Sequence, residues 1–551
     1  MNTAVQKLMR PIASLALLAP AVLLALVGLA GPTVSTFLLS LQKQSLITSP
    51  EFVGGQNFSR LLADKAFSAA LTYTLEDMGM RLLAVAIVPV LLALAVSRFG
   101  RAVRWPVRLL FTVPAAMFAP AAIAAVWLET SAGGAPYIAP DTARRTVLLI
   151  DTLYVFGLAC AAGTVVYLTV LRHPTGSLAS SRKPLVATWL VSLLAVAALT
   201  LQSFTLNYVL TSGGRVGSIA TVALYQFGLA FRFLNLGAAA AVASLMLAIL
   251  GVLGLAAGLI IVLEGLKIEL RPWRESAAPM GGQGEAQPSR AGVTVLLVVV
   301  LLISLVIGTV AIRPALSSIL LSFSTGQAYQ EFFRNVPVAS VLANTLVPPL
   351  LAILLQLPVA YLAAFGIGAV RPLGRWSEFL LLPVSPWLFV TALPLSLVAF
   401  QNLHEMHAVN TLIALVPPVP LSVPMIFVLT LFFKGQEAHW RSARASGQSA
   451  TAAAWSQLIL PSLPMVLLLA AIALLIGLQE FYWPLVITSD RGAMPFTISL
   501  FSLMTQRVGW PVVAAGITLF EAPAFMLLFI ILGALQCLYV DRLALTDGRP
   551  G

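Results

Sequence analysis

The chain has 551 residues, of which 59% are hydrophobic and 9% are charged, with a formal net charge of +12. Soluble domains carry roughly 25% charged residues, so this composition excludes an ordinary soluble globular protein and favours a polytopic membrane protein. The positive charge borders apolar runs, as expected for loops at a membrane surface. We therefore expect the lipid bilayer, and not nucleic acid, as a partner.

Apolar runs recur along the chain, and each is long enough to cross a bilayer as a helix. We therefore expect an all-α polytopic membrane protein with about twelve transmembrane helices. Basic loops place both termini on the cytoplasmic side of the cytoplasmic (inner) membrane. The predicted spans are residues 12–39, 70–97, 109–128, 146–171, 185–203, 236–263, 292–313, 340–366, 377–401, 409–433, 462–485 and 512–540.

A polar stretch rich in Gly, Pro, Gln and Ser divides the chain near its middle, which is typical of a flexible joint. The predicted parts are a transmembrane domain over 1–266, a cytoplasmic linker over 267–291 and a second transmembrane domain over 292–551. Residue types recur across this linker at constant offsets, which indicates two homologous halves. The pairs 277 residues apart include Pro184 and Pro461, Gln202 and Gln479, and Phe204 and Phe481; those 271 apart include Thr74-Leu75 and Thr345-Leu346, and Arg104-Trp105 and Arg375-Trp376.

The longest polar stretch closely flanked by apolar runs is residues 432–464. Its Lys and Arg residues place it in the cytoplasm. Its Ala-rich composition predicts a short helix from about Glu437 to Trp455. We expect Leu460-Pro461 to end this helix, because proline cannot continue a helix interior.

The stretch contains Phe432-Phe433, Ala443, Gly447, Trp455 and Leu460-Pro461. Through these residues it resembles the coupling-loop signature of binding-protein-dependent ABC importer permeases. The signature glutamate is missing, because Arg441 or Ser442 stands in its place. The resemblance implies a type I importer fold and a coupling helix that docks on an ATPase subunit. The corresponding first-half loop lacks about fifteen residues between Leu171 and Pro184. The resemblance implies that the ATPase-coupling residues are Ala443, Gly447, Trp455, Leu460 and Pro461.

Two further stretches extend the resemblance. Residues 202–214, QSFTLNYVLTSGG, resemble the first subunit of carbohydrate-type permeases, and residues 479–490, QEFYWPLVITSD, resemble its partner. The chain is thus similar to two fused permease subunits of the maltose and glycerol-phosphate kind. This implies a transport subunit and not an enzyme, without a cofactor of its own. It also implies two partners, an ATP-binding cassette ATPase dimer and an extracytoplasmic solute-binding protein. Consistently, the chain has no GxxxxGK[ST] phosphate-binding loop.

The same two stretches place amides, hydroxyls and aromatic rings at the outer ends of apolar runs. Polar groups at membrane depth are costly unless they line a cavity or pair within the bundle. They are therefore candidates for the solute path, while hydrogen bonding between helices and anchoring at the membrane interface remain open alternatives. The expected path residues are Gln202, Asn207, Gln479, Glu480 and Tyr482.

Other polar residues give weaker signals. The stretch His404-Glu405-Met406-His407 lacks the spacing of a helical zinc motif, so we expect no metal site. Asp77 and Arg81 are spaced for an i,i+4 ion pair. Three alternatives to a carbohydrate permease remain, namely an importer permease for iron, thiamine or polyamine, an ion-coupled secondary transporter and, because the first-half loop is short, a scaffold that transports nothing. Charged residues deep in the spans would favour the secondary transporter.

Overall fold

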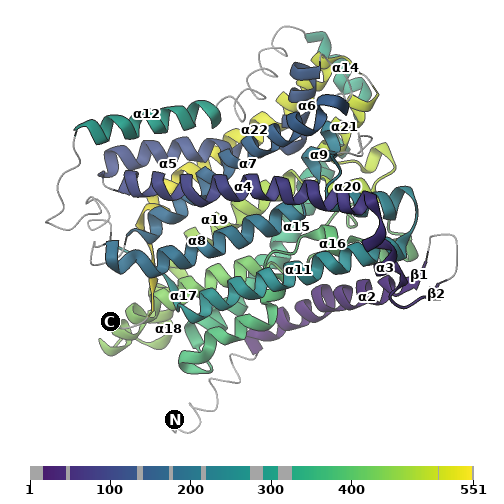
Figure 1. Cartoon of the computed structure of the whole chain (residues 1–551). Helices are drawn as coiled ribbons and strands as arrows, with labels where there is room; N and C mark the ends of the chain where they lie inside the picture. Colours follow the sequence, from purple (N-terminus) through teal and green to yellow (C-terminus); the bar gives the residue numbers. More distant parts are fainter. Residues whose placement is uncertain are drawn as a thin grey trace.

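The computed structural model describes residues 16–44, 50–97, 99–132, 140–172, 178–211, 219–272, 290–307, 326–506 and 508–548. They form a bundle of long helices whose axes are roughly aligned (Figure 1). Two small two-stranded sheets also occur, β1 with β2 and β3 with β4. Helices suit a bilayer because each satisfies its own backbone hydrogen bonds. The expectation of an all-α membrane protein is confirmed.

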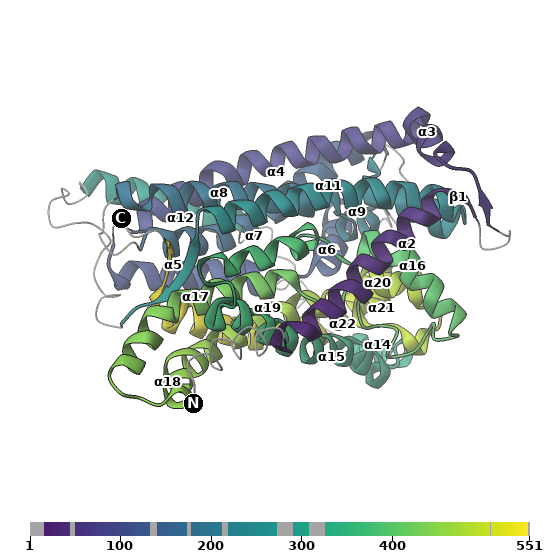
Figure 2. The same cartoon turned by 90° about the horizontal axis from the view of Figure 1, so that it is seen from below.

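The first part of the chain is built around long helices that lie side by side, α4, α7, α8 and α11 (Figures 1 and 2). In chain order its elements are the π-helix Leu26–Ala30, α2 Gly31–Ser40, β1 Gln42–Lys43, β2 Glu51–Phe52, α3 Gln56–Ala63, α4 Lys65–Ser97, α5 Arg101–Ala116, α6 Pro120–Ala132, α7 Pro140–Val170, α8 Leu178–Leu201, α9 Thr205–Leu210, α10 Val222–Phe227, the π-helix Gly228–Arg232, α11 Leu236–Leu263 and β3 Leu266–Leu270.

The second part follows residues 273–289, which lie outside the described residues. Its elements are α12 Arg290–Ile307, α14 Gly326–Asn335, α15 Val338–Phe365, the π-helix Gly366–Val370, the 3-10 helix η7 Gly374–Trp387, α16 Ala392–Glu405, α17 Val423–Ala445, α18 Ala450–Ala454, the π-helix Trp455–Ile459, α19 Leu460–Leu478, α20 Tyr482–Ile487, the 3-10 helix Arg491–Ala493, α21 Phe496–Thr505, α22 Trp510–Leu538, the 3-10 helix Val540–Arg542 and β4 Leu543–Asp547.

Seven helices of the described residues are long and apolar enough to cross a membrane. The number becomes nine if two sharply bent pairs, α5 with α6 at 79° and η7 with α16 at 71°, each count as one span. These bends replace the straight spans expected at 109–128 and 377–401, because prolines at Pro120 and Pro386 interrupt helical hydrogen bonding there. The chain is therefore a multi-pass membrane protein.

The helix expected over residues 409–433 was placed wrongly. Helix α17 begins only at Val423, and the preceding residues 406–422 form turns and extended backbone. The reason is a group of prolines at 417, 418 and 420, which lack the N–H that a helix interior needs. The apolar run was real, but only its second half is helical.

The order of helices repeats along the chain. The offset is 277 residues for the first two pairs below and 274 residues for the last two, close to the 277 and 271 found in the sequence. The matching pairs are α9 Thr205–Leu210 with α20 Tyr482–Ile487, the ends of α8 and α19 at Leu201 and Leu478, the starts of α10 and α21 at Val222 and Phe496, and the starts of α11 and α22 at Leu236 and Trp510. The repeated threonines also make equivalent bonds. Thr74 Oγ1 accepts from the Val222 backbone N–H at 3.0 Å, and Thr345 Oγ1 accepts from that of Phe496 at 2.9 Å.

Strands β3 and β4 join the end of the first series of helices to the end of the second. They pair antiparallel, with Leu266 opposite Asp547 and Ile268 opposite Leu545. The start of the expected linker, residues 267–270, is therefore a strand. The strand packs closely on α17 at Gly435, where an added Cβ would lie 1.9 Å from the Ile268 carbonyl oxygen. We call this paired and packed unit the clasp.

The clasp also carries polar bonds between the two series. Lys434 Nζ donates to the Gly265 carbonyl at 3.0 Å and lies 3.4 Å from Glu378 Oε1. Burial lowers the pKa of Lys434, while Glu378 opposes this by favouring the charged amine. The middle of α17 and the end of α11 are thereby held together.

Asp541, next to β4, is a fully buried carboxylate surrounded by arginines of the first series. Its neighbours are Arg172 Nη2 at 2.7 Å, Arg108 Nε at 3.2 Å, and Arg101 Nε and Arg104 Nε, each at 3.6 Å. Arg104 and Arg108 are themselves fully buried. One carboxylate therefore organises four guanidinium groups that come from α5 and from the residues after α7.

Candidate functional site

Two short equivalent helices, α9 and α20, meet inside the bundle through aromatic rings. Phe204 and Phe481 precede these helices and have ring centroids 6.5 Å apart. Phe204 also stands edge-on to Tyr482 at 4.8 Å, and Tyr208 lies 5.7 Å from Phe481. Phe204, Phe481 and Tyr482 are each at most 5% exposed. The stretches expected to form a solute path are thus brought together, and their aromatic rings fill the space between them.

Gln202 makes four hydrogen bonds, three of them to the other series. Its Nε2 donates to the carbonyls of Ala198 and Phe389, at 3.0 and 2.8 Å. Its Oε1 accepts from the backbone N–H and the hydroxyl of Thr391, at 2.9 and 2.7 Å. Phe389 and Thr391 lie at the bend between η7 and α16. In this conformation the amide of Gln202 is occupied by bonds between helices, which was the alternative to a solute contact.

Asn207 and Tyr482 have buried polar groups of different kinds. Asn207 Oδ1 accepts from the Tyr73 hydroxyl at 3.2 Å, whereas its buried Nδ2 has no hydrogen-bond partner in the described part of the chain. The Tyr482 hydroxyl bonds to the Ser396 hydroxyl at 2.7 Å. An amide donor left without a partner costs about 1–3 kcal/mol, so Asn207, one of the residues expected along a path, carries an unsatisfied donor in this conformation.

Gln479 stands at the position equivalent to Gln202 but bonds differently. Its Nε2 donates to Glu521 Oε2 on α22 at 2.7 Å, and its buried Oε1 has no partner among the described residues. The two repeated glutamines therefore do not make equivalent contacts. Gln202 links the two series, whereas Gln479 bonds within the second series and keeps a free acceptor.

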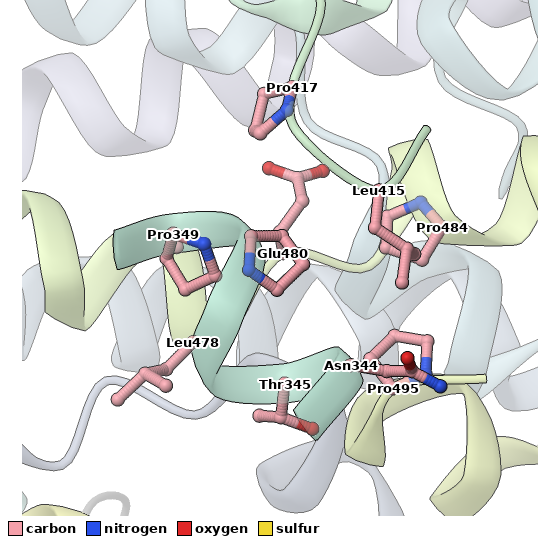
Figure 3. A pocket seen from close by; sticks show the side chains of 11 residues that line it. Asn344, Thr345, Pro349, Leu415, Pro417, Leu478, Glu480, Pro484 and Pro495 are labelled. Carbon is pink, nitrogen blue, oxygen red and sulfur yellow. The ribbon is translucent and has the colours of Figure 1, made fainter. Parts of the chain in front are cut away.

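Glu480 points into a small cavity lined by prolines (Figure 3). The cavity measures about 20 Å³, enough for about one water molecule. Glu480 Oε1 accepts from the Trp483 backbone N–H at 3.2 Å, so the carboxylate lies at the N-terminal end of α20. Asn344 and Thr345 also line the cavity, but Asn344 Nδ2 donates to the Gly492 carbonyl at 2.8 Å. Glu480 thus stabilises α20 in this conformation.

A charged cluster lies beside α9. Arg81 Nη2 is 2.7 Å from Asp77 Oδ2, which confirms the predicted pair, and it also bonds to Asp151 on α7. The same nitrogen lies 3.2 Å from Ser203 Oγ, next to Phe204. Asp151 was missed because no local spacing links it to Arg81, although a carboxylate inside an apolar run was a visible signal. Two carboxylates share one guanidinium, so the cluster carries an excess negative charge or a proton.

The second candidate site is the projection formed by the end of α17, residues 446–449 and α18. Phe432 and Phe433 are fully buried at its base, and Phe433 packs edge-on to Tyr361 at 5.2 Å. The tip is exposed, and Trp455 is 59% exposed. Ala443 lies near the end of α17, where its carbonyl accepts from the Gln448 N–H at 3.3 Å.

Gly447 has a definite local reason to be glycine. Its φ is +92°, the left-handed region that other residues rarely adopt. Together with the bond from Gln448 to Ala443, its own N–H donates to the Arg444 carbonyl at 3.2 Å. This is the Schellman pattern that ends helices at a glycine. A side chain at Gly447 would meet open space, so the turn is sensitive through backbone conformation and not through packing.

The prediction that Leu460-Pro461 ends the helix was wrong. Residues 450–478 form one continuous span, and the π-helix Trp455–Ile459 comes immediately before Pro461. The wider π turn accommodates the missing proline N–H, so the helix continues. The break lies earlier, at Gly447. Leu460 is 53% exposed, and the Pro461 carbonyl accepts from the Tyr539 hydroxyl at 3.0 Å.

The first-half loop that was expected to be short lies partly at residues 173–177, outside the described residues. A comparison of the two projections therefore stays a prediction. No known family model matches the sequence, and no curated protein matches it.

Proposed function

We propose that the chain is the membrane-spanning permease of an ABC importer, built from two homologous halves and working with a separate ATPase dimer and an extracytoplasmic solute-binding protein. The repeated helix order, with matching boundaries and matching threonine bonds, supports the two-halves interpretation. The aromatic contact between α9 and α20 supports a closed path between the halves. In the proposed orientation across the membrane, the projection and both termini face the cytoplasm.

The exposed projection of α17, Gly447 and α18 carries this proposal. A helical turn that leaves the bundle, with its tip exposed and its base fixed by two buried phenylalanines, is suited to docking in a partner. The middle of α17, at Gly435, is packed against the clasp, so a push on the projection at the end of this helix would reach the junction of the two halves. Such coupling is a shift between two packings that a partner's contacts bias.

The proposed cargo is a small carbohydrate. The aromatic rings of Phe204, Tyr208 and Tyr482 could stack on a sugar face once α9 and α20 separate, and Asn207 Nδ2 could donate to its hydroxyls. Opening would break the aromatic contacts and the Gln202 bonds to the bend of η7 and α16. Iron, thiamine and polyamine remain alternative cargoes for the same architecture.

The experiment is solute uptake into vesicles that contain the chain, its ATPase and its binding protein. We expect uptake to require ATP and to survive collapse of the proton and sodium gradients. The variant Gly447→Val should reduce solute-stimulated ATP hydrolysis strongly, because valine disfavours the left-handed backbone of the turn. The matched control is Gly55→Val, at an exposed glycine with an ordinary backbone and open space around it.

The buried cluster of Arg81, Asp77 and Asp151 favours a second candidate, an ion-coupled secondary transporter. Ionisable residues inside a membrane domain commonly mark ion or proton pathways. Uptake driven by an ion gradient without ATP, and lost in Asp151→Asn, would select this candidate. Uptake that needs ATP and persists in Asp151→Asn would leave the cluster a structural role.

A further inference from the structure

A groove of about 840 Å³ lies between the segment that follows α15 and the base of the projection. Its lining includes four arginines, one glutamate and one tryptophan, namely Arg371, Arg375, Arg441, Arg444, Glu437 and Trp440. Such an excess of positive charge in one groove requires an explanation, because like charges placed together repel each other.

The single carboxylate in this groove is already engaged. Glu437 bonds to Arg371 and to Arg441, and Arg371 also lies 3.0 Å from Glu378. Arg375 and Arg444 have no acidic partner in the part of the chain that the structure describes; each instead lies over an aromatic ring. The Arg375 guanidinium is 5.1 Å from the Trp376 ring and that of Arg444 is 5.9 Å from the Trp440 ring. Two cations are therefore available to a ligand.

The groove also offers a neutral donor. The indole N–H of Trp440 is buried and has no acceptor among the described residues. An indole N–H can only donate, as can a guanidinium. The free polar groups of the groove are thus all donors, which selects a ligand rich in acceptors and negatively charged. A phosphate group has this chemistry, and arginine binds it well.

The remaining wall of the groove is apolar and belongs to membrane spans. Phe365 and Val370 lie at the end of the candidate span 338–370, and Ala454 and Leu458 lie near the start of the span 450–478. The groove therefore opens where helices leave the hydrocarbon region. Basic pockets between transmembrane helices on one membrane face are suited to anionic headgroups.

We propose that this groove binds the phosphate headgroup of an anionic phospholipid, with Arg375, Arg444 and the Trp440 indole as donors. The acyl chains would follow the apolar wall formed by Phe365 and Leu458. The ligand would bridge the end of one span and the base of the projection. The proposal does not depend on what the chain transports.

The test uses the full-length chain purified in detergent and measures bound lipid by native mass spectrometry. The probes are phosphatidylglycerol, phosphatidylcholine as the neutral lipid, and inorganic phosphate as the free anion. The double variant Arg375→Gln/Arg444→Gln should weaken phosphatidylglycerol binding roughly tenfold to thirtyfold. The reason is that each basic residue near an anionic membrane surface contributes to the binding free energy, and the variant removes two of them. The control Arg60→Gln/Arg334→Gln removes equal charge from exposed residues of α3 and α14 and should bind normally.

Trp440→Phe provides a second variant that keeps all charges and most of the ring. It should weaken binding several-fold, as expected for one lost hydrogen bond. Equal phosphatidylglycerol affinity in wild type and both groove variants would overturn the proposal. Displacement of the lipid by millimolar inorganic phosphate would assign the groove to a soluble phosphate instead. Unchanged lipid binding combined with loss of a partner ATPase would make the groove a protein-docking surface, which also overturns the lipid assignment.

Discussion

Replacing Asp541 with asparagine should destabilise the junction of the two series more than the same substitution at an exposed aspartate does. Asparagine keeps the shape of the side chain but removes its charge. Asp541 is fully buried, with Arg172 and Arg108 at 2.7 and 3.2 Å. Each close ion pair is worth about 4 kcal/mol at an effective dielectric constant near 20, although repulsion among the arginines and desolvation cancel much of this.

Removing one partner of a buried ion pair typically costs about 3–5 kcal/mol, because the other charge is left buried. We expect a loss of stability of this size for Asp541→Asn, seen as a fall of the thermal unfolding midpoint on the order of 5 °C. The assay is thermal unfolding of the purified chain in detergent. The control is Asp490→Asn, at an exposed aspartate without an ion pair among the described residues. Equal midpoints for the two variants would refute the view that Asp541 organises the arginines.

Three further predictions follow from the contacts between the series. Gly435→Val should dislodge β3, because even one added carbon would meet the Ile268 carbonyl at 1.9 Å, and proteolysis should then cleave near residue 270 faster than in wild type. Gln202→Leu should lower the unfolding free energy by about 1–3 kcal/mol, since it removes the hydrogen bonds of the buried Gln202 amide to Phe389 and Thr391; unchanged stability would show that these bonds are dispensable. Cysteines at Ser446 and His404 should react with impermeant reagents from opposite sides of the membrane, and labelling from one side would contradict the orientation proposed here.

Long apolar helices were predictable because a helix that crosses the bilayer needs a certain length and an apolar composition, and both are visible in the sequence. The helix expected over 236–263 begins and ends at those residues. The start of α17 was not predicted, because hydropathy does not distinguish a helix from a proline-rich extended segment. The strand Leu266–Leu270 shows the alternation LKIEL in the sequence, but its partner is remote in the chain. A five-residue strand without a visible partner gives too little signal.

The candidate site was only partly predictable from the sequence. The repeated stretches that contain Gln202 and Gln479 were found from their offset, and the structure places their aromatic neighbours in contact. The carboxylates that complete each arginine cluster were not found. Asp151 pairs with Arg81 and Asp541 pairs with Arg104, and the two members of each pair lie far apart in the sequence. Charge pairing across a bundle depends on helix packing, which a single sequence does not reveal.

The register of the clasp has a consequence for how such a chain could arise. Ile268 lies opposite Leu545, the residue 277 positions later, and Leu266 and Leu270 face Asp547 and Leu543. Residues 277 positions apart are equivalent in the two halves, so exchanging the two strands leaves the pairing unchanged. This is the geometry of an isologous contact between identical subunits. A half-length ancestor with one such strand could have closed a symmetric homodimer through the same pairing. Fusion would then have preserved an existing interface, and the later divergence that surrounds Asp541 with arginines would have been free to make the two sides unequal.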